Sequence, residues 1–190
     1  MPARSSGRQA RGRRTVVAGA AALQGFPPVI DAGVERLILG SFPSAASLAA
    51  GQYYAHPRNQ FWPILGRLLG EPLPELPYAE RVRRVLAQHV GIWDVYDACD
   101  RAGSADTAIR NSRPNAFARL RRLAPRLCSV AFNGLAAGRF RPLFDQAGFA
   151  TAVLPSTSPA HAGRSLEQKF ELWAAWWHEA ICAKAAAGKG

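Results

Sequence analysis

The sequence predicts an α/β fold, a three-layer α/β/α sandwich around a four-stranded parallel sheet. Four short, continuously apolar runs end in Gly, Pro, Ser or Asp, as strands buried on both faces do. Amphipathic helical patterns separate these runs, so strands and helices alternate along the chain. The 190 residues are 48% hydrophobic and 19% charged, which fits one globular domain. We expect residues 1–22 to form a basic flexible tail and residues 23–184 to form a single domain.

The expected strands are the four apolar runs, taken in chain order. They cover residues 34–42, 90–96, 128–134 and 151–157. None alternates between apolar and polar residues, so we expect each to be covered by helices on both faces.

The first two expected helices lie between the first and second strands. Phe61, Ile64, Leu65, Leu68 and Leu69 share one helical face, and Gly70 stops that helix. Val82, Val85, Leu86 and His89 share the face of the next.

The remaining helices follow the later strands. One is expected over residues 117–124, after an Asn115 cap and before Pro125. The pattern over residues 135–147 must kink or split at Pro142. Ser165 and Gln168 form a capping box that opens the last helix. Its expected buried stripe is Leu166, Phe170, Trp173, Trp177 and Ile181.

The charge balance favours a polyanionic partner. Lys and Arg number 24 against 13 Asp and Glu, a formal net charge of +11. Such a field suits nucleic acid or an anionic membrane surface. No run of about 18 apolar residues is present that could span a bilayer. The three cysteines, Cys99, Cys128 and Cys182, lack metal-site spacing, so we expect a reducing compartment.

The first 25 residues carry Arg4, Arg8, Arg11, Arg13 and Arg14 and no acid. Three interpretations stay open for them. They could form an arm that slides along phosphates, an export signal in which "TVVAGAAAL" is the apolar part, or a tail without a role.

Ligands of open parallel sheets bind beyond the carboxyl ends of the strands. Those ends carry "GSFPS" (40–44), "DVYDACD" (94–100), "NGLAAG" (133–138) and "PSTSPAHA" (155–162). The stretch "YYAHPRNQFW" (53–62) follows the first of them. Pro63 fits only the first turn of a helix, so Asn59 should lie at or just before the helix start, at the mouth of a cleft. Exposed Tyr, His, Arg and Asn side chains there suit a flat polar ligand.

Each candidate residue also has a structural interpretation. Asn59 could be an N-cap, His56 a hydrogen-bonded loop residue, and Asn133 a turn residue. Asp94, Asp97 and Asp100 could bind a metal or begin a solvated helix. Seven arginines between Arg101 and Arg126 could contact phosphates or form a solvated face.

Familiar catalytic motifs do not explain the chain. It contains no GxSxG, GxxxxGK[ST] or GxGxxG pattern. Apart from the three aspartates, no evident pair of carboxylates lies in the strand-end loops. What remains is a site of amides and aromatics in a basic protein. In such a site an aromatic stacks on a base, an amide reads the edge of the base, and arginines hold the backbone.

"GSFPS…QYYAHPRNQFW" and "LPSTSPAHA" resemble the uracil-DNA glycosylase superfamily, and its hypoxanthine (deoxyinosine) DNA glycosylase branch most closely. The resemblance runs from about Leu23 to about Trp177. It implies a four-stranded parallel sheet flanked by helices, in agreement with the pattern above. It also implies that residues 23–184 are a DNA glycosylase domain.

The resemblance implies roles for individual residues. Residues 40–43 correspond to the superfamily's first motif, whose third position often holds an Asp or Asn that activates water but here is Phe42. The catalytic role then passes to Asn59, Tyr54 stacks on the flipped base, and Asn133 reads its edge. The implied base-binding residues are Gly40, Ser41, Phe42, Tyr54 and His56. The implied DNA contacts are Arg58, Ser156, Thr157, Ser158, Pro159 and His161.

These inferences together predict a monofunctional DNA glycosylase that removes deaminated bases, hypoxanthine first and uracil second. The expected partner is double-stranded DNA containing such a base, with no membrane partner, no metal and no cofactor. We expect a monomer in the cytoplasm, associated with the nucleoid. The alternatives are a uracil or mismatch-specific glycosylase, a non-catalytic binder of damaged nucleic acid, and a metal-dependent nuclease built on the three aspartates.

Overall fold

The computed structural model describes residues 22–187, and the side chains of residues 22–179. The predicted basic tail therefore lies, except for its last residue, outside the described residues. In the described part of the chain, no helix has the length and apolar character needed to cross a membrane.

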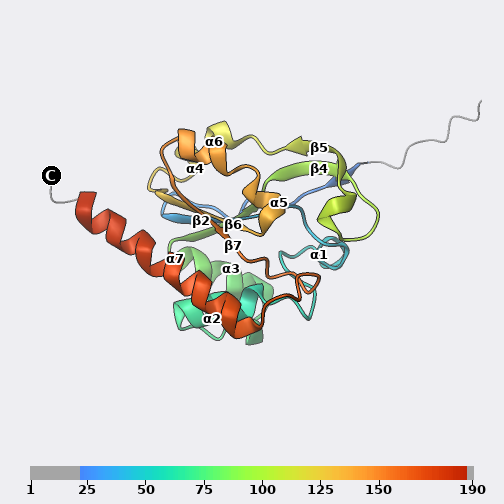
Figure 1. The fold of residues 1–190 in the computed structure, drawn as a ribbon, viewed down its shortest axis with the longest axis horizontal. Coiled ribbons are helices and arrows are strands. Elements are labelled where there is room, and N and C mark those ends of the chain that lie inside the picture. The colour runs from blue at the N-terminus through green and yellow to red at the C-terminus, as the bar shows by residue number, and fades with distance from the viewer. Residues whose placement is uncertain (1–21, 188–190) are drawn as a thin grey trace, which may run out of the picture.

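A four-stranded parallel sheet forms the middle layer, in the order β3-β2-β6-β7 (Figure 1). Its strands are β2 (Arg36–Gly40), β3 (Val90–Asp94), β6 (Ser129–Asn133) and β7 (Ala150–Leu154). All three pairs of neighbouring strands are parallel, which confirms the predicted sheet.

Helices cover both faces of this sheet (Figure 1). One face carries α2 (Phe61–Leu69), α3 (Tyr78–Ala87) and α7 (Leu166–Ala187). The other carries α4 (Leu120–Leu123), α5 (Leu135–Gly138) and α6 (Arg141–Gln146). A short helix, α1 (Ala45–Ala50), follows β2, and single 3-10 turns lie at Leu73–Glu75, Asp106–Ala108 and Phe117–Arg119. The three-layer α/β/α architecture is thus confirmed.

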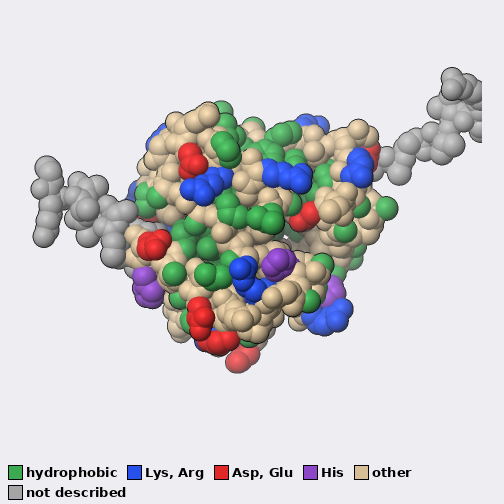
Figure 2. Space-filling view, viewed as in Figure 1, with side chains coloured by type: hydrophobic (Ala, Val, Ile, Leu, Met, Phe, Trp, Pro, Cys, Tyr) green, Lys and Arg blue, Asp and Glu red, His purple; other side chains and the backbone are tan. Residues whose placement is uncertain are grey.

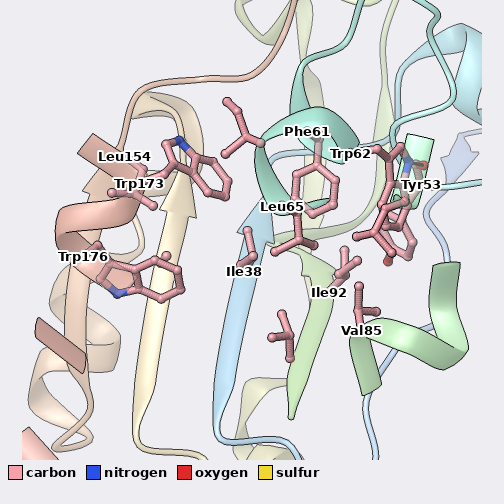
Figure 3. Close-up of a cluster of buried hydrophobic side chains, with 14 residues drawn as sticks. Ile38, Tyr53, Phe61, Trp62, Leu65, Val85, Ile92, Leu154, Trp173 and Trp176 are labelled. Atoms are coloured by element: carbon pink, nitrogen blue, oxygen red, sulfur yellow. Dashed lines mark hydrogen bonds between the residues drawn. The ribbon is translucent and has the colours of Figure 1, made fainter. Parts of the chain in front are cut away.

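The larger core lies between the sheet and α2, α3 and α7 (Figure 3). Its labelled side chains are Ile38, Tyr53, Phe61, Trp62, Leu65, Val85, Ile92, Leu154, Trp173 and Trp176. The predicted stripe of α7 omitted Trp176, which is buried, whereas Leu166, Phe170 and Trp177 are partly buried against the same core. The Arg36 guanidinium lies over the Trp177 ring, 4.3 Å from its centroid. The side chain of Ile181 lies outside the described residues.

The structure also contains a second sheet, which the sequence did not predict. Its three strands pair antiparallel in the order β1 (Leu23–Gln24), β4 (Tyr96–Asp100) and β5 (Arg110–Pro114). Every residue of β5 is exposed, so hydrophobic periodicity cannot reveal it. The predicted helical start at the three aspartates was wrong, since Asp97 and Asp100 lie on β4. Both are used locally, because Asp97 pairs with Arg113 at 2.6 Å and Asp100 accepts a hydrogen bond from Asn111 at 2.8 Å.

Local signals explain two of the predicted helix boundaries. Ser165 and Gln168 exchange the two hydrogen bonds of the predicted capping box, at 3.0 and 3.2 Å. Pro142 splits the predicted 135–147 segment into α5 and α6, because it stands in the first turn of α6 and cannot donate from within a helix. The predicted Asn115 cap was wrong. Its side chain donates to the Asp94 carbonyl at 2.9 Å, so a 3-10 turn begins the segment instead.

Candidate functional site

The carboxyl ends of all four parallel strands meet at one edge of the sheet. Gly40 pairs in register with Asp94, and Asn133 pairs with Leu154. Gln60, at the end of the 53–60 loop, donates its backbone N–H to the Thr157 carbonyl at 3.0 Å. This hydrogen bond joins the 53–60 loop to the 155–162 loop, so the predicted site residues come from two segments about 100 positions apart.

Gly40 is required by what lies against its backbone. A Cβ there would stand 2.3 Å from Asp94 Oδ1 and 2.9 Å from the Tyr54 hydroxyl oxygen. Any side chain at this position would therefore push both groups away from the end of β2. The absence of a side chain allows two polar groups to converge on the same backbone atom.

Tyr54 is held in an uncommon conformation beside Gly40. Its φ of 55° lies in the left-handed region, which is unfavourable for an aromatic residue. The ring stacks on Phe61 with centroids 3.7 Å apart and planes 16° from parallel. Its hydroxyl is buried beside the Asn133 amide, but no hydrogen bond of ordinary geometry reaches it. Burial, followed by the nearby charge of Asp94, raises the pKa of Tyr54 far above its usual value, and hydrogen bonding to Asn133 opposes part of this shift. The hydroxyl therefore stays protonated.

Asp94 is the residue whose role the sequence reasoning missed. It is 3% exposed, and its Oδ2 atom is buried without a hydrogen-bond partner. Burial, and then the charge of Asp106, raise the pKa of Asp94 to about 8, while Arg101 opposes the shift. The carboxyl is consequently neutral at pH 7. The sequence did contain a signal for this role. Asp94 ends the buried strand β3, and Gly40 ends the neighbouring strand β2, at the edge of the sheet where ligands bind.

Thr157 fixes the amide of Asn133. The Asn133 Nδ2 atom donates to Thr157 Oγ1 at 2.9 Å, and Asn133 Oδ1 accepts from the Thr157 backbone N–H at 2.9 Å. The amide retains a second N–H and a second lone pair, which lie beside the Tyr54 hydroxyl and can turn to a ligand. The expected contact between the Thr157 side chain and DNA was wrong, because that residue is fully buried. Thr157 instead orients Asn133.

Asn59 stands at the predicted place, just before α2, and is partly exposed. The N-cap position of α2 is Gln60, one residue later than the N-cap interpretation of Asn59 required. The Asn59 Oδ1 atom nevertheless accepts from the backbone N–H of Phe61, the first residue of α2, at 2.9 Å. Among the described residues, no group accepts a hydrogen bond from its amide nitrogen. The contact with Phe61 therefore leaves the NH2 group free to hold a ligand or a water molecule.

The residues around Asn59 shape the 53–60 loop. His56 Nδ1 accepts from the Arg58 backbone N–H at 3.1 Å, and the Asn59 N–H donates to the His56 carbonyl at 2.8 Å. Arg58 is exposed and Pro57 turns the chain. His56 therefore has a clear structural role, and its second ring nitrogen remains available.

The 155–162 loop is shaped by its own hydroxyls. Ser156 Oγ accepts from the Ser158 N–H at 3.2 Å, and Ser158 Oγ accepts from the Ala160 N–H at 3.3 Å. Pro159 is partly exposed and His161 is exposed. Both serine hydroxyls keep their own hydrogen for a phosphate or sugar oxygen.

The first strand end is occupied by internal contacts. Ser41 Oγ hydrogen-bonds to Asp106 Oδ1, and the Phe42 ring is 6% exposed beneath the Arg101 guanidinium, 5.0 Å away. Arg101 also donates to the Pro43 carbonyl. The Phe42 ring is therefore covered by protein in this structure.

Six of the seven clustered arginines make contacts within the fold. Arg110 donates to the carbonyls of Thr107 and Ile109, and the Arg119 guanidinium lies over the Trp93 ring. Arg113 and Arg126 pair with Asp97 and Glu35, while Arg101 and Arg121 donate to backbone carbonyls. These contacts weaken the interpretation of the cluster as a uniform phosphate-binding face. Across the described side chains, no group of three His, Cys, Asp or Glu residues is arranged to hold a metal ion.

Comparisons with known proteins agree with this architecture. The model of the uracil DNA glycosylase superfamily matches residues 27–180. The chain is 42% identical over 151 residues to a protein of Methanosarcina barkeri (strain Fusaro / DSM 804) named hypoxanthine DNA glycosylase, covering 80% of this chain and 95% of that protein. A protein of the same name from Methanosarcina acetivorans is 39% identical over 155 residues, covering 82% and 98%.

A solved structure has a similar fold. The solution NMR structure of a candidate uracil DNA glycosylase from Methanosarcina acetivorans superposes with a TM-score of 0.74 at 36% sequence identity. The match covers 83% of this chain and 98% of that chain. Sequence and fold thus point to the same group of proteins.

Proposed function

Because the chain belongs to the uracil DNA glycosylase superfamily, we propose that it is a DNA repair glycosylase that removes deaminated bases from double-stranded DNA, hypoxanthine before uracil. The observation that carries this proposal is its 39–42% identity to proteins named hypoxanthine DNA glycosylases over most of the chain. The clustering of Tyr54, Asn59 and Asn133 around one edge of the sheet supports it.

The target base must leave the duplex to reach this edge. Phe61 covers one face of the Tyr54 ring at 3.7 Å, so an extruded base stacks on the opposite face. Unstacking costs a few kcal/mol and costs least for a mispaired base, which favours deaminated bases over normal ones. The strained backbone of Tyr54 holds the ring ready before the base arrives.

The reaction replaces the bond between the sugar and the base with a bond between the sugar and a water oxygen, and the proton that the water loses ends on the departed base. As the C1′–N bond breaks, its electron pair moves to the base and positive character develops on the sugar. The free NH2 group of Asn59 positions water against the sugar, which is a contribution of orientation, because an amide cannot take a proton. The remaining N–H of Asn133 donates to the base as it becomes negative.

Asp94 contributes by being uncharged. A carboxylate at this buried position would repel the leaving base, whereas the neutral acid does not. The raised pKa, about 8, keeps the acid neutral at pH 7. Ionisation of Asp94 above that pH should therefore slow the departure of the base.

One amide can select both deaminated bases. Hypoxanthine and uracil each present a carbonyl beside an N–H, which match the donor and the acceptor that Asn133 retains. Adenine and cytosine present the reverse pattern. They would leave buried groups unpaired, which costs about 1–3 kcal/mol of binding free energy. Phe42 supplies no group to activate water, which disfavours uracil relative to hypoxanthine.

The test is incubation with inosine-containing and uracil-containing duplexes in EDTA, followed by alkali. A monofunctional glycosylase leaves an abasic site, so the strand should break only after alkali. Scission that precedes alkali and disappears in EDTA would indicate a metal-dependent nuclease. Tight binding without any cleavable product would indicate a non-catalytic binder.

The formal charge of +11 suits a protein that stays close to DNA. We propose that it acts as a monomer on nucleoid DNA in the cytoplasm. Sedimentation of the protein alone and with a short duplex tests the monomer, because a dimer would double the mass of the free protein and add one further protein mass to the complex.

A further inference from the structure

Lys169, on the first turn of α7, is a buried cation. It is 2% exposed, and its Nζ atom donates to Gln60 Oε1 at 2.8 Å and to the His161 carbonyl at 2.9 Å. Both acceptors are neutral. Among the described side chains, no carboxylate forms a salt bridge with Nζ. A buried charge is normally compensated by an opposite charge, so this lysine lacks its usual partner.

Lys169 also forms part of the wall of a pocket of about 290 Å³. Two further cations line it, Arg58 and Arg164, together with His161 and Ser158. No acidic residue is among the lining residues, and Gln60 supplies a neutral amide. In Figure 2, basic and histidine side chains gather on the face that carries the loop between β7 and α7. Three cations with a hydroxyl and an imidazole match the oxygens of a phosphate group.

The pocket adjoins the proposed site. Arg58 and Gln60 flank Asn59 in the sequence, and Ser158 and His161 belong to the loop that carries Thr157. Through Gln60 and His161, the Lys169 Nζ atom cross-links the two loops that carry the proposed chemistry. A phosphate in the pocket would lie beside the nucleotide whose base is extruded.

We propose that this pocket binds one backbone phosphodiester of DNA next to the target nucleotide, and that Lys169 supplies the buried counter-charge. The inference rests on the proposed function for the identity of its ligand. Lys169 is thus both a phosphate contact and a positioning residue for the Asn59 loop. A phosphate bound there tightens the same hydrogen bonds that fix the two loops.

The test compares Lys169→Met with the wild-type protein in binding an inosine-containing duplex across a series of salt concentrations. Loss of one phosphate contact should reduce the slope of log affinity against log salt by about 0.9. Arg83→Met is the matched control. It removes one charge from α3, where Arg83 is 76% exposed and its partner Glu80 also pairs with Arg84. The control should leave the slope unchanged.

Single methylphosphonate linkages, which carry no charge, identify the phosphate. One position near the inosine should weaken binding by the wild-type protein and have little further effect on Lys169→Met. If Lys169→Met fails to fold, Arg164→Met serves instead, because Arg164 is exposed and its removal disturbs no buried contact.

Three results would overturn the proposal. The first is lower affinity with an unchanged slope, which indicates a purely structural lysine. The second is methylphosphonate effects that simply add to the effect of the substitution. The third is stronger inhibition by inorganic phosphate than by chloride at equal ionic strength without methylphosphonate coupling, which indicates a site for free phosphate. Binding is measured separately from excision, so a failure of the proposed activity would not be mistaken for a failure of the pocket.

Discussion

Asp94→Asn tests the claim that a neutral group is needed behind the extruded base. Asparagine has nearly the shape of the protonated acid but cannot ionise. At pH 7 the wild-type carboxyl is already neutral, with its pKa raised by burial to about 8, so the variant should excise hypoxanthine at a similar rate. Above pH 8 the wild-type rate should fall about tenfold per unit relative to the variant, because only the neutral fraction is active.

The same substitution should change stability in a pH-dependent way. The folded protein keeps the Asp94 proton up to about pH 8, whereas the unfolded chain loses it above the ordinary value of 3.8. Wild-type stability therefore falls as pH rises between these values. At 1.36 kcal/mol per pK unit, the loss at pH 7 is at most about 4 kcal/mol. Asp94→Asn should be more stable than the wild type at pH 7, and this difference should shrink near pH 4.

The assays are single-turnover excision from pH 6 to about pH 9.5 and urea unfolding at pH 4 and pH 7. The ratio of variant to wild-type rates is the informative quantity, because ionisation of the base or the DNA affects both proteins equally. A ratio that stays flat above pH 8 would refute the reasoning. So would a variant with little activity at pH 7.

Three further predictions concern the other contacts. Gly40→Ala should lose most excision activity and about 1–3 kcal/mol of stability, because its Cβ would lie 2.3 Å from Asp94 Oδ1. The control is Gly163→Ala, where a Cβ meets nothing within 4 Å. Equal stability of the two variants would contradict the argument. Thr157→Val leaves one N–H of the Asn133 amide unpaired, so the excision rate in single-turnover assays should fall about tenfold. An unchanged rate would show that Thr157 does not orient the amide. Hypoxanthine should be excised faster than uracil from otherwise identical duplexes; the reverse order would assign the chain to a different branch of its superfamily.

The central sheet was predictable from the sequence because its strands are buried on both faces and read as continuous apolar runs. The antiparallel sheet was not, because β5 is wholly exposed and β1 has only two residues. Trp176 was left out of the predicted buried stripe of α7, since adjacent tryptophans leave the phase of a helix ambiguous. Boundaries set by Pro142 and by the Ser165 capping box were predictable, because each depends on local chemistry alone.

The site was predictable in its motifs and less so in its contacts. The sequence indicated Asn59 and its position before α2, but the partner of Asn133 depended on how two distant loops meet. Thr157 was expected to contact DNA because its neighbours are polar loop residues, and only its burial shows that it serves Asn133. The sequence named Asp94 only as a possible metal ligand or helix start and did not single out Lys169, because a charged side chain becomes informative only when it is known to be buried away from water.

The most direct test of the account is single-turnover excision of hypoxanthine by Asn59→Ala, with duplex affinity measured in parallel. The side chain also accepts from the Phe61 N–H at the start of α2, so Asn59→Ser, which restores an accepting oxygen without the amide, is the matched variant. The account predicts that both variants lose most excision while binding the duplex almost as tightly as the wild type, because a group that orients water acts mainly in the transition state. Near-normal excision by Asn59→Ala, or full recovery in Asn59→Ser, would contradict it.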